Sequence, residues 1–228
     1  MPRDQDAVAA IKAGDVDALV ALLTVEPALA TARPDGARTL LHVLTDWPGG
    51  LPNGAELVRA LAAAGADVDA RFLGAHSETP LHWAASSDDL PVLDALLDAG
   101  AAIDAPGAVI ANGTPLSDAV AFGNRAAARR LVERGASMRP AEAAALGLVD
   151  RLAATLPPGQ DELDLAFWYA CHGGSRDAAA YLLGRGPALD HLPDWERLTP
   201  LDAAERAGAT GLVAWLRERG AHRASELG

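Results

Sequence analysis

The feature that most constrains this chain is a short motif that recurs along it. The tripeptide Thr-Pro-Leu begins at Thr79, Thr114 and Thr199, and a variant, Thr-Leu-Leu-His, begins at Thr39. Thr79 and Thr114 lie 35 positions apart, and self-similarity with a period of roughly 20 to 50 residues is the signature of a repeat architecture. The 228 residues are therefore expected to form an array of similar repeats rather than one globular core.

Each copy of the motif predicts the start of a helix, and a second helix follows it. Threonine is a favourable N-cap because its hydroxyl accepts a hydrogen bond from an unpaired N–H, and proline in the first turn sacrifices no hydrogen bond. An Ala-rich stretch follows, then a Gly or polar turn, then a Leu-rich stretch. Glycine favours the left-handed conformation that ends a helix. It stands in the closing pairs Gly65-Ala66, Gly100-Ala101, Gly135-Ala136 and Gly220-Ala221.

The most regular copy runs Thr79-Pro80-Leu81-His82-Trp83-Ala84-Ala85, and Leu96-Leu97-Asp98-Ala99-Gly100-Ala101 follows it. This pattern resembles an ankyrin repeat, and its recurrence over residues 4–222 makes the chain similar to stand-alone ankyrin-repeat proteins of the bacterial type. The resemblance implies an all-α solenoid of about seven helix–turn–helix repeats, with short loops or hairpins between them. It also implies a structural role for the motif residues, which are Thr79, Pro80, Leu81, His82, Thr114, Pro115, Thr199 and Pro200. In that family the motif histidine bonds to the backbone of the neighbouring repeat, so His42 and His82 are expected to be structural.

The expected repeats are unequal, although together they form a single domain over residues 1–228. They span residues 4–38, 39–78, 79–113, 114–139, 140–161, 162–198 and 199–222. The second carries an insert at residues 47–54, which is either a binding addition or neutral length variation. The fifth is short and lacks the usual hairpin, and the sixth has Leu165-Ala166-Phe167-Trp168 in place of the motif. Residues 224–228 are expected to fray.

Composition narrows the classes of partner. The net charge of −12 and the pI of about 4.8 argue against nucleic acid, which basic faces bind. The apolar runs are short, so no membrane-spanning helix is expected. Cys171 is the one cysteine, which rules out an intrachain disulfide and favours a cytoplasmic setting. The expected state is a monomer whose partner is another protein.

The sequence offers no recognisable catalytic or cofactor motif. It contains no CxxC, HExxH, GxGxxG or Walker-type pattern, so no metal and no cofactor are predicted. Cys171 falls where the repeat requires a small buried residue, and a free buried cysteine behaves as a small hydrophobe. No catalytic residue is assigned, and the chain is predicted not to be an enzyme.

The ankyrin resemblance implies a binding groove lined by the residue that follows the motif histidine in each repeat. Those positions hold Val43, Trp83, Asp118, Tyr169 and Ala203. Exposed aromatic side chains are typical interface anchors, which makes Trp83 and Tyr169 candidate contacts unless they pack beneath the adjacent loops. Phe122 lies one helical turn beyond Asp118 and is expected to join the same surface.

The loops between repeats are the second candidate surface, because loops carry function more than the scaffold does. The loop at residues 71–78 includes Arg71, Phe72 and His76, and the loop at residues 191–197 includes Trp195. The apolar loop at residues 105–112 is expected either to bind or to stack on its neighbour.

Two classes of function remain open at this level. The first is a non-enzymatic scaffold that binds a protein through the concave groove and the loops. The alternative is a small-molecule binder or an unusual enzyme, with a pocket in the irregular fifth and sixth repeats. A neutraliser of another protein would be a special case of the first class.

Overall fold

A computed structural model of the chain describes residues 3–110, 112–155 and 159–228. These residues form helices and no strands. They divide into two compact bodies, an N-terminal body, Met1–Ala136, and a C-terminal body, Ser137–Gly228. Each body is a stack of helix pairs with its own core.

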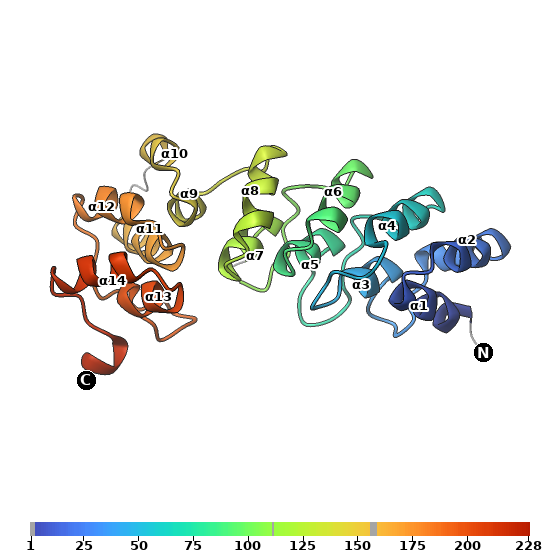
Figure 1. Ribbon diagram of the computed structural model, residues 1–228, viewed down its shortest axis with the longest axis horizontal. Coiled ribbons are helices and arrows are strands. Elements are labelled where there is room, and N and C mark those ends of the chain that lie inside the picture. The colour runs from blue at the N-terminus through green and yellow to red at the C-terminus, as the bar shows by residue number, and fades with distance from the viewer. Residues whose placement is uncertain (1–2, 111, 156–158) are drawn as a thin grey trace. The chain divides into compact units, whose positions relative to one another are not determined.

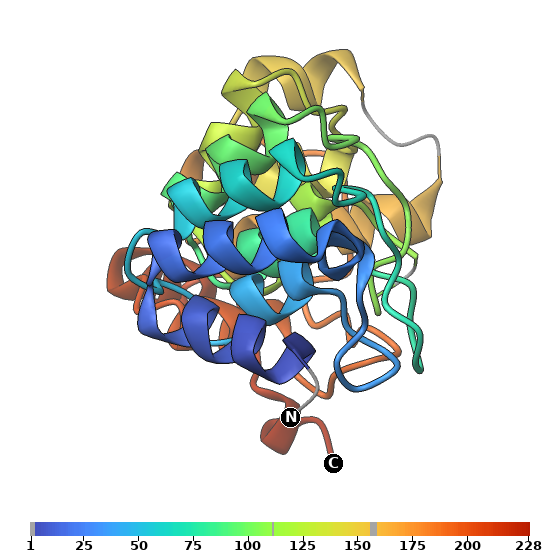
Figure 2. The same ribbon diagram turned by 90° about the vertical axis from the view of Figure 1, so that its right-hand side faces the viewer.

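The N-terminal body contains four helix pairs (Figure 1). Their helices are α1 (Arg3–Ala13), α2 (Val16–Val25), α3 (Leu40–Thr45), α4 (Gly54–Ala63), α5 (Pro80–Ser86), α6 (Leu90–Asp98), α7 (Pro115–Ala121) and α8 (Arg125–Glu133). The first helices of the pairs form one layer, and the second helices form the other (Figure 1). The loops that follow α2, α4 and α6 extend from one side of this body (Figure 2).

The motif histidines bind each repeat to the next one. In His82, Nδ1 accepts a hydrogen bond from the backbone N–H of Thr79 at 3.1 Å, and Nε2 donates to the carbonyl of Gly113 at 3.4 Å. His42 makes the same pair of contacts, with Thr39 N–H and with the carbonyl of Glu78. Burial lowers the pKa of each imidazole to about 4. Both rings are therefore neutral near pH 7, as these hydrogen bonds require.

The C-terminal body contains three helix pairs. Their helices are α9 (Pro140–Leu146), α10 (Val149–Ala154), α11 (Gln160–His172), α12 (Arg176–Leu183), α13 (Pro200–Arg206) and α14 (Thr210–Arg217). The first helices, α9, α11 and α13, pack side by side (Figure 1). Phe167 of α11 is fully buried in their core with Leu163, Leu201 and Cys171. The large ring thus fills space that Leu81 fills in the regular repeat.

Trp168 takes over the role of the motif histidine in the sixth repeat. Its indole N–H donates to the carbonyl of Leu198 at 2.8 Å, and Leu198 directly precedes Thr199. Glu78 and Gly113, which receive the histidine bonds, also directly precede a motif threonine. A buried donor at this position therefore suffices, and the replacement of histidine by tryptophan conserves the contact between repeats.

The helix that carries Trp168 approaches its neighbour closely at Gly173. This residue ends α11, and a Cβ atom added there would lie 2.0 Å from the carbonyl oxygen of Ala145. Because the added methyl group overpacks this contact, we expect Gly173→Ala to lower the free energy of unfolding by about 1–3 kcal/mol. Urea unfolding measures this change. Gly184, at the equivalent end of α12, has its nearest neighbour at 3.7 Å. Gly184→Ala is the control and should leave stability unchanged or slightly raised; an equal loss in both variants would contradict the close approach.

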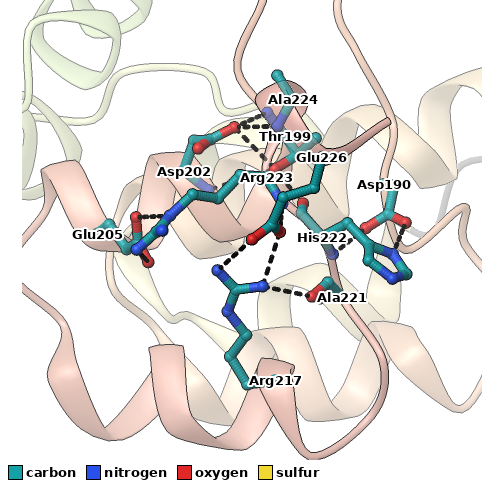
Figure 3. A network of polar contacts seen from close by, with 10 residues as sticks. All are labelled: Asp190, Thr199, Asp202, Glu205, Arg217, Ala221, His222, Arg223, Ala224 and Glu226. Carbon is teal, nitrogen blue, oxygen red and sulfur yellow. Dashed lines mark hydrogen bonds and ion pairs between the residues drawn. The ribbon is translucent and has the colours of Figure 1, made fainter. Parts of the chain in front are cut away.

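The end of the chain is held by polar contacts (Figure 3). The backbone N–H of Ala224 donates to Asp202 at 2.9 Å, and Glu226 forms an ion pair with Arg217 at 2.7 Å. Ala224–Glu226 forms a short 3-10 helix. The expectation of fraying is therefore wrong for residues 224–226, because carboxylates of α13 and of the tail itself satisfy the donors of this segment.

Candidate binding site in the N-terminal body

A cavity of about 350 Å³ opens among the first helices and loops of the N-terminal body. The end of α3, the helices α5 and α7, the loop at residues 71–78 and residues 109–110 of the following loop surround it. The cavity brings together four residues expected to bind, His76, Trp83, Asp118 and Phe122. Elements of three successive helix pairs thus contribute to one site.

Trp83 forms the inner aromatic wall and is half-buried. Its indole N–H donates to Oε2 of Glu78 at 2.8 Å. Its ring lies 5.5 Å from the ring of Phe72, and Phe72 stacks on His76 at 4.5 Å, both distances between centroids. The loop at residues 71–78 therefore packs against Trp83 and fixes its orientation, while part of the indole lines the cavity.

Glu78 links three parts of this wall. Besides the indole of Trp83, its carboxylate accepts from the backbone N–H of Val109 at 3.0 Å, and His76 Nδ1 lies 3.3 Å from Oε2. The side chain is only 12% exposed. Since one carboxylate joins both loops to α5, the cavity has a fixed wall before any ligand arrives.

Asp118 is the unusual polar group of the site. The residue is 2% exposed, and its Oδ2 atom has no hydrogen-bond partner among the residues that the structure describes. Burial raises the pKa of this carboxyl to about 8, and the negative charge of Glu78 adds to the rise. A buried acceptor without a donor is costly, and such groups concentrate at sites that receive a ligand.

Large apolar side chains form the rim of the cavity. Trp47, Val109 and Phe122 are 81%, 67% and 64% exposed, and all three line the opening. The apolar loop at residues 105–112 thus presents Val109 outward. Single exposed hydrophobic residues are common, but several around one opening mark an interaction surface.

The other expected binding residues lie elsewhere or hold the fold together. Arg71 donates to the carbonyls of Ser77 and Pro106, so it bridges two loops. Tyr169 and Trp195 belong to the C-terminal body, where their rings lie 6.3 Å apart. Trp195 is 46% exposed, and Tyr169 is half-buried.

Sequence reasoning does not name Trp47 or Glu78 individually, although Trp47 begins the insert that was open to a binding role and Glu78 ends a loop expected to bind. The sequence nevertheless indicates that Trp47 is exposed, because a Pro/Gly-rich insert supplies few apolar side chains that could cover a tryptophan at its edge. Glu78 carries no comparable signal, since its partners depend on the path of two loops.

Three further features of the described residues bear on function: the reactivity of the cysteine, clusters that could hold a metal, and helices that could span a membrane. Cys171 is fully buried, and burial raises the pKa of its thiol, so it is a poor nucleophile. Within the described part of the chain, no group of three or more His, Cys, Asp or Glu side chains could hold a metal ion. Over the same residues, none of the helices has the length and hydropathy needed to cross a bilayer.

Comparison with known proteins agrees with the repeat architecture. Residues 51–142 match the family model for ankyrin repeats in three copies. These residues are ankyrin repeats. The all-α ankyrin solenoid expected from the Thr-Pro-Leu motif is thereby confirmed. None of the curated proteins compared with the chain matches it.

Among solved structures, the ankyrin repeat domain of human ASB11 is similar to this chain. The two share 24% identity with a TM-score of 0.53, over 97% of this chain and 85% of the ASB11 chain. A likeness at this identity concerns the fold. Ankyrin repeats are in general modules that bind other proteins, and their fold is typically a non-enzymatic scaffold.

Proposed function

We propose that this chain is a non-enzymatic scaffold that binds another protein through the first helices and loops of its N-terminal body. One observation carries the proposal: three large apolar side chains, Trp47, Val109 and Phe122, are exposed around one cavity with a fixed aromatic and polar wall. Aromatic anchors beside a preformed pocket are the usual centre of a protein interface. The single buried Cys171 fits a cytoplasmic setting, and the binding species is the monomer.

The insert at residues 47–54 serves binding in this proposal. Gly50 N–H donates to Asp89 at 2.7 Å, and the side-chain amide of Asn53 donates to the carbonyl of Gly14 at 2.9 Å. Both neighbouring helix pairs thus restrain the insert. Trp47 is exposed from a restrained loop, so less conformational entropy is lost when a partner covers it.

A capture experiment tests the proposal. Wild type and the Trp47→Ser, Phe122→Ser double variant are used to capture proteins from a lysate of the native host, which quantitative mass spectrometry then compares. We expect the double variant to lose at least about tenfold of the specifically captured protein, because truncating two interface anchors costs about 2 kcal/mol or more.

The matched control removes exposed apolar surface elsewhere in the same body. Val20 and Val25 of α2 are 45% and 66% exposed. The Val20→Ser, Val25→Ser variant should capture the same protein as wild type. Equal capture by both double variants and wild type would refute the assignment of the rim as the binding surface.

A further inference from the structure

The cavity of the N-terminal body is acidic as well as aromatic. Three carboxylates line it, those of Asp46, Glu78 and Asp118, and none of the described lining residues is lysine or arginine. Arg38 pairs with Asp46, and Glu78 is bonded to Trp83 and Val109. Among the described residues, two buried side-chain atoms of the lining have no hydrogen-bond partner, Oδ2 of Asp118 and Nδ1 of His76. Of these two atoms, the carboxyl oxygen of Asp118 is the acceptor that can bind a charged donor.

The chemistry of this acceptor selects the ligand. An anion would be repelled by the carboxylate of Glu78, and an apolar group would leave Oδ2 of Asp118 without a donor. A quaternary ammonium would supply charge but no N–H group. The ligand must therefore be a cation that donates hydrogen bonds.

The aromatic walls favour a guanidinium over an ammonium. A guanidinium is planar, is weakly hydrated, stacks on aromatic faces and carries five N–H donors. Trp83 lines the cavity beside Asp118, and Phe122 stands at the opening one turn further along the chain. A volume of about 350 Å³ lies near the lower limit of ligand pockets, so it suits one side chain rather than a large cofactor.

We infer that the cavity receives the arginine side chain of a basic segment in the partner protein. This inference rests on the proposed function, because it names the group by which the partner is held. The exposed rim explains why the arginine belongs to a polypeptide: a free guanidine compound would leave Trp47, Val109 and Phe122 uncovered. The net charge of −12 favours approach of a basic segment over an acidic one.

Proton exchange accompanies this binding. The free carboxyl of Asp118, with its pKa of about 8, holds a proton at neutral pH, and a guanidinium in the cavity favours the ionised form. Glu78 and His76 from the loop and Asp46 from the end of α3 face the same space. Affinity for the arginine group should therefore rise as the pH increases from 6 to 9.

The test uses the full chain and an isolated arginine group. NMR follows the indole N–H signal of Trp83, assigned with Trp83→Phe, while Nα-acetyl-arginine methylamide is added at pH 8. The lysine and citrulline amides are added in parallel, since citrulline has the shape of arginine without its charge. We expect a saturable shift with arginine on the order of millimolar affinity, and at least tenfold weaker binding of the other two.

Two variants locate the contact. Asp118→Asn keeps the size of the side chain and removes its charge, so it should weaken arginine binding at least tenfold and abolish the dependence on pH. Asp17, exposed on α2, is the control, and Asp17→Asn should bind arginine as wild type does. Equal binding of arginine and citrulline, or unchanged binding in Asp118→Asn, would overturn the inference.

The source of the arginine is tested with peptides. A synthetic library of nine-residue peptides with a central arginine is screened, and the tightest binder is resynthesised with citrulline. We expect the arginine peptide to bind at least tenfold tighter than the amide, and Trp47→Ser, at the exposed rim, to remove this advantage but not binding of the amide. An amide that binds as tightly as the best peptide would mean a free guanidine ligand and would refute a polypeptide source.

The outcomes separate this inference from the function on which it rests. Loss of capture in the Trp47→Ser, Phe122→Ser variant, together with no response of Trp83 to arginine, would leave the scaffold function standing and refute the arginine pocket. Retained capture in that variant would refute the rim as the partner's site, whatever the arginine amide does.

Discussion

Phe167→Ala should destabilise the C-terminal body by about 4 kcal/mol, the cost of removing a large aromatic side chain from a packed core. Phe167 is 0% exposed and lies among Leu163, Leu201 and Cys171. The first helices α9 and α13 pack against its helix, so the cavity left behind has no short route to collapse. The expected loss therefore falls in the upper part of the range for truncations of core side chains.

The buried thiol of Cys171 provides the measurement. It lies in the same core and is 0% exposed, so a disulfide reagent reaches it only when the core opens. When opening of the core is at equilibrium, lowering the free energy of unfolding by about 4 kcal/mol raises the labelling rate of Cys171 roughly a thousandfold over that of wild type. Phe122 is 64% exposed in the other body, so Phe122→Ala should change neither the labelling rate nor the stability measurably. Equal labelling rates in Phe167→Ala and wild type would show that Phe167 does not support this core.

The repeat motif predicted the fold well because each of its residues acts locally. Thr114 and Thr199 cap helices that begin at the next residue, and the proline there fits the first turn. Local hydrogen bonds of this kind can be read from adjacent residues without knowledge of distant ones. The motif therefore located these helices to the residue.

The sixth repeat was harder to predict because the side chains that replace the motif have different chemistry. Leu165-Ala166 lacks both the cap and the proline, so α11 begins earlier, at Gln160. The bond from Trp168 to Leu198 spans 30 residues. Trp168 occupies the position of the motif histidine in the alignment, which is the one sequence feature related to this bond. The two side chains differ in size and acidity and share only a ring N–H donor.

The candidate site could be predicted only in part. Alignment placed Trp83, Asp118 and Phe122 on one surface, and they line one cavity. The burial of Asp118 and the three contacts of Glu78 depend on where the loops at residues 71–78 and 105–113 run. Loop paths are set by tertiary contacts, which motif spacing does not encode.

The stability of the N-terminal body should be greatest near pH 6.5 and fall on both sides. His42 and His82 have pKa values of about 4 when folded, against 6.5 as the ordinary value. Their contribution is complete above pH 6.5 and is lost as the pH falls toward 4. Asp118 acts in the opposite direction, because its pKa is raised from 3.8 to about 8, and stability is lost as the pH rises through this window.

The difference in the number of protons bound by the unfolded and the folded chain sets how steeply the free energy of unfolding changes with pH. Between pH 4 and 6.5 the unfolded chain binds protons on His42 and His82 that the folded chain lacks. Over the same range the folded chain binds one proton on Asp118 that the unfolded chain lacks. The difference of one proton gives a rise of about 1.4 kcal/mol per pH unit. Above pH 6.5 only the Asp118 proton remains, so stability falls by about the same amount per unit until pH 8. Asp35, with a pKa lowered to about 2 chiefly by the backbone N–H of Arg38, acts below this range.

Asp118→Asn separates the two effects. Without the carboxyl, the slope below pH 6.5 should double to about 2.7 kcal/mol per unit, and stability above pH 6.5 should become independent of pH. At pH 8 the variant should exceed wild type by a few kcal/mol, because no buried carboxyl has to be kept protonated. Urea titrations of the full chain, followed by the Trp83 indole N–H signal between pH 4.5 and 8.5, measure this body specifically. Two results would show that Asp118 does not hold its proton at neutral pH: a wild-type stability that keeps rising up to pH 8, or an Asp118→Asn profile parallel to that of wild type. The slope below pH 6.5 would then be due to the two motif histidines alone.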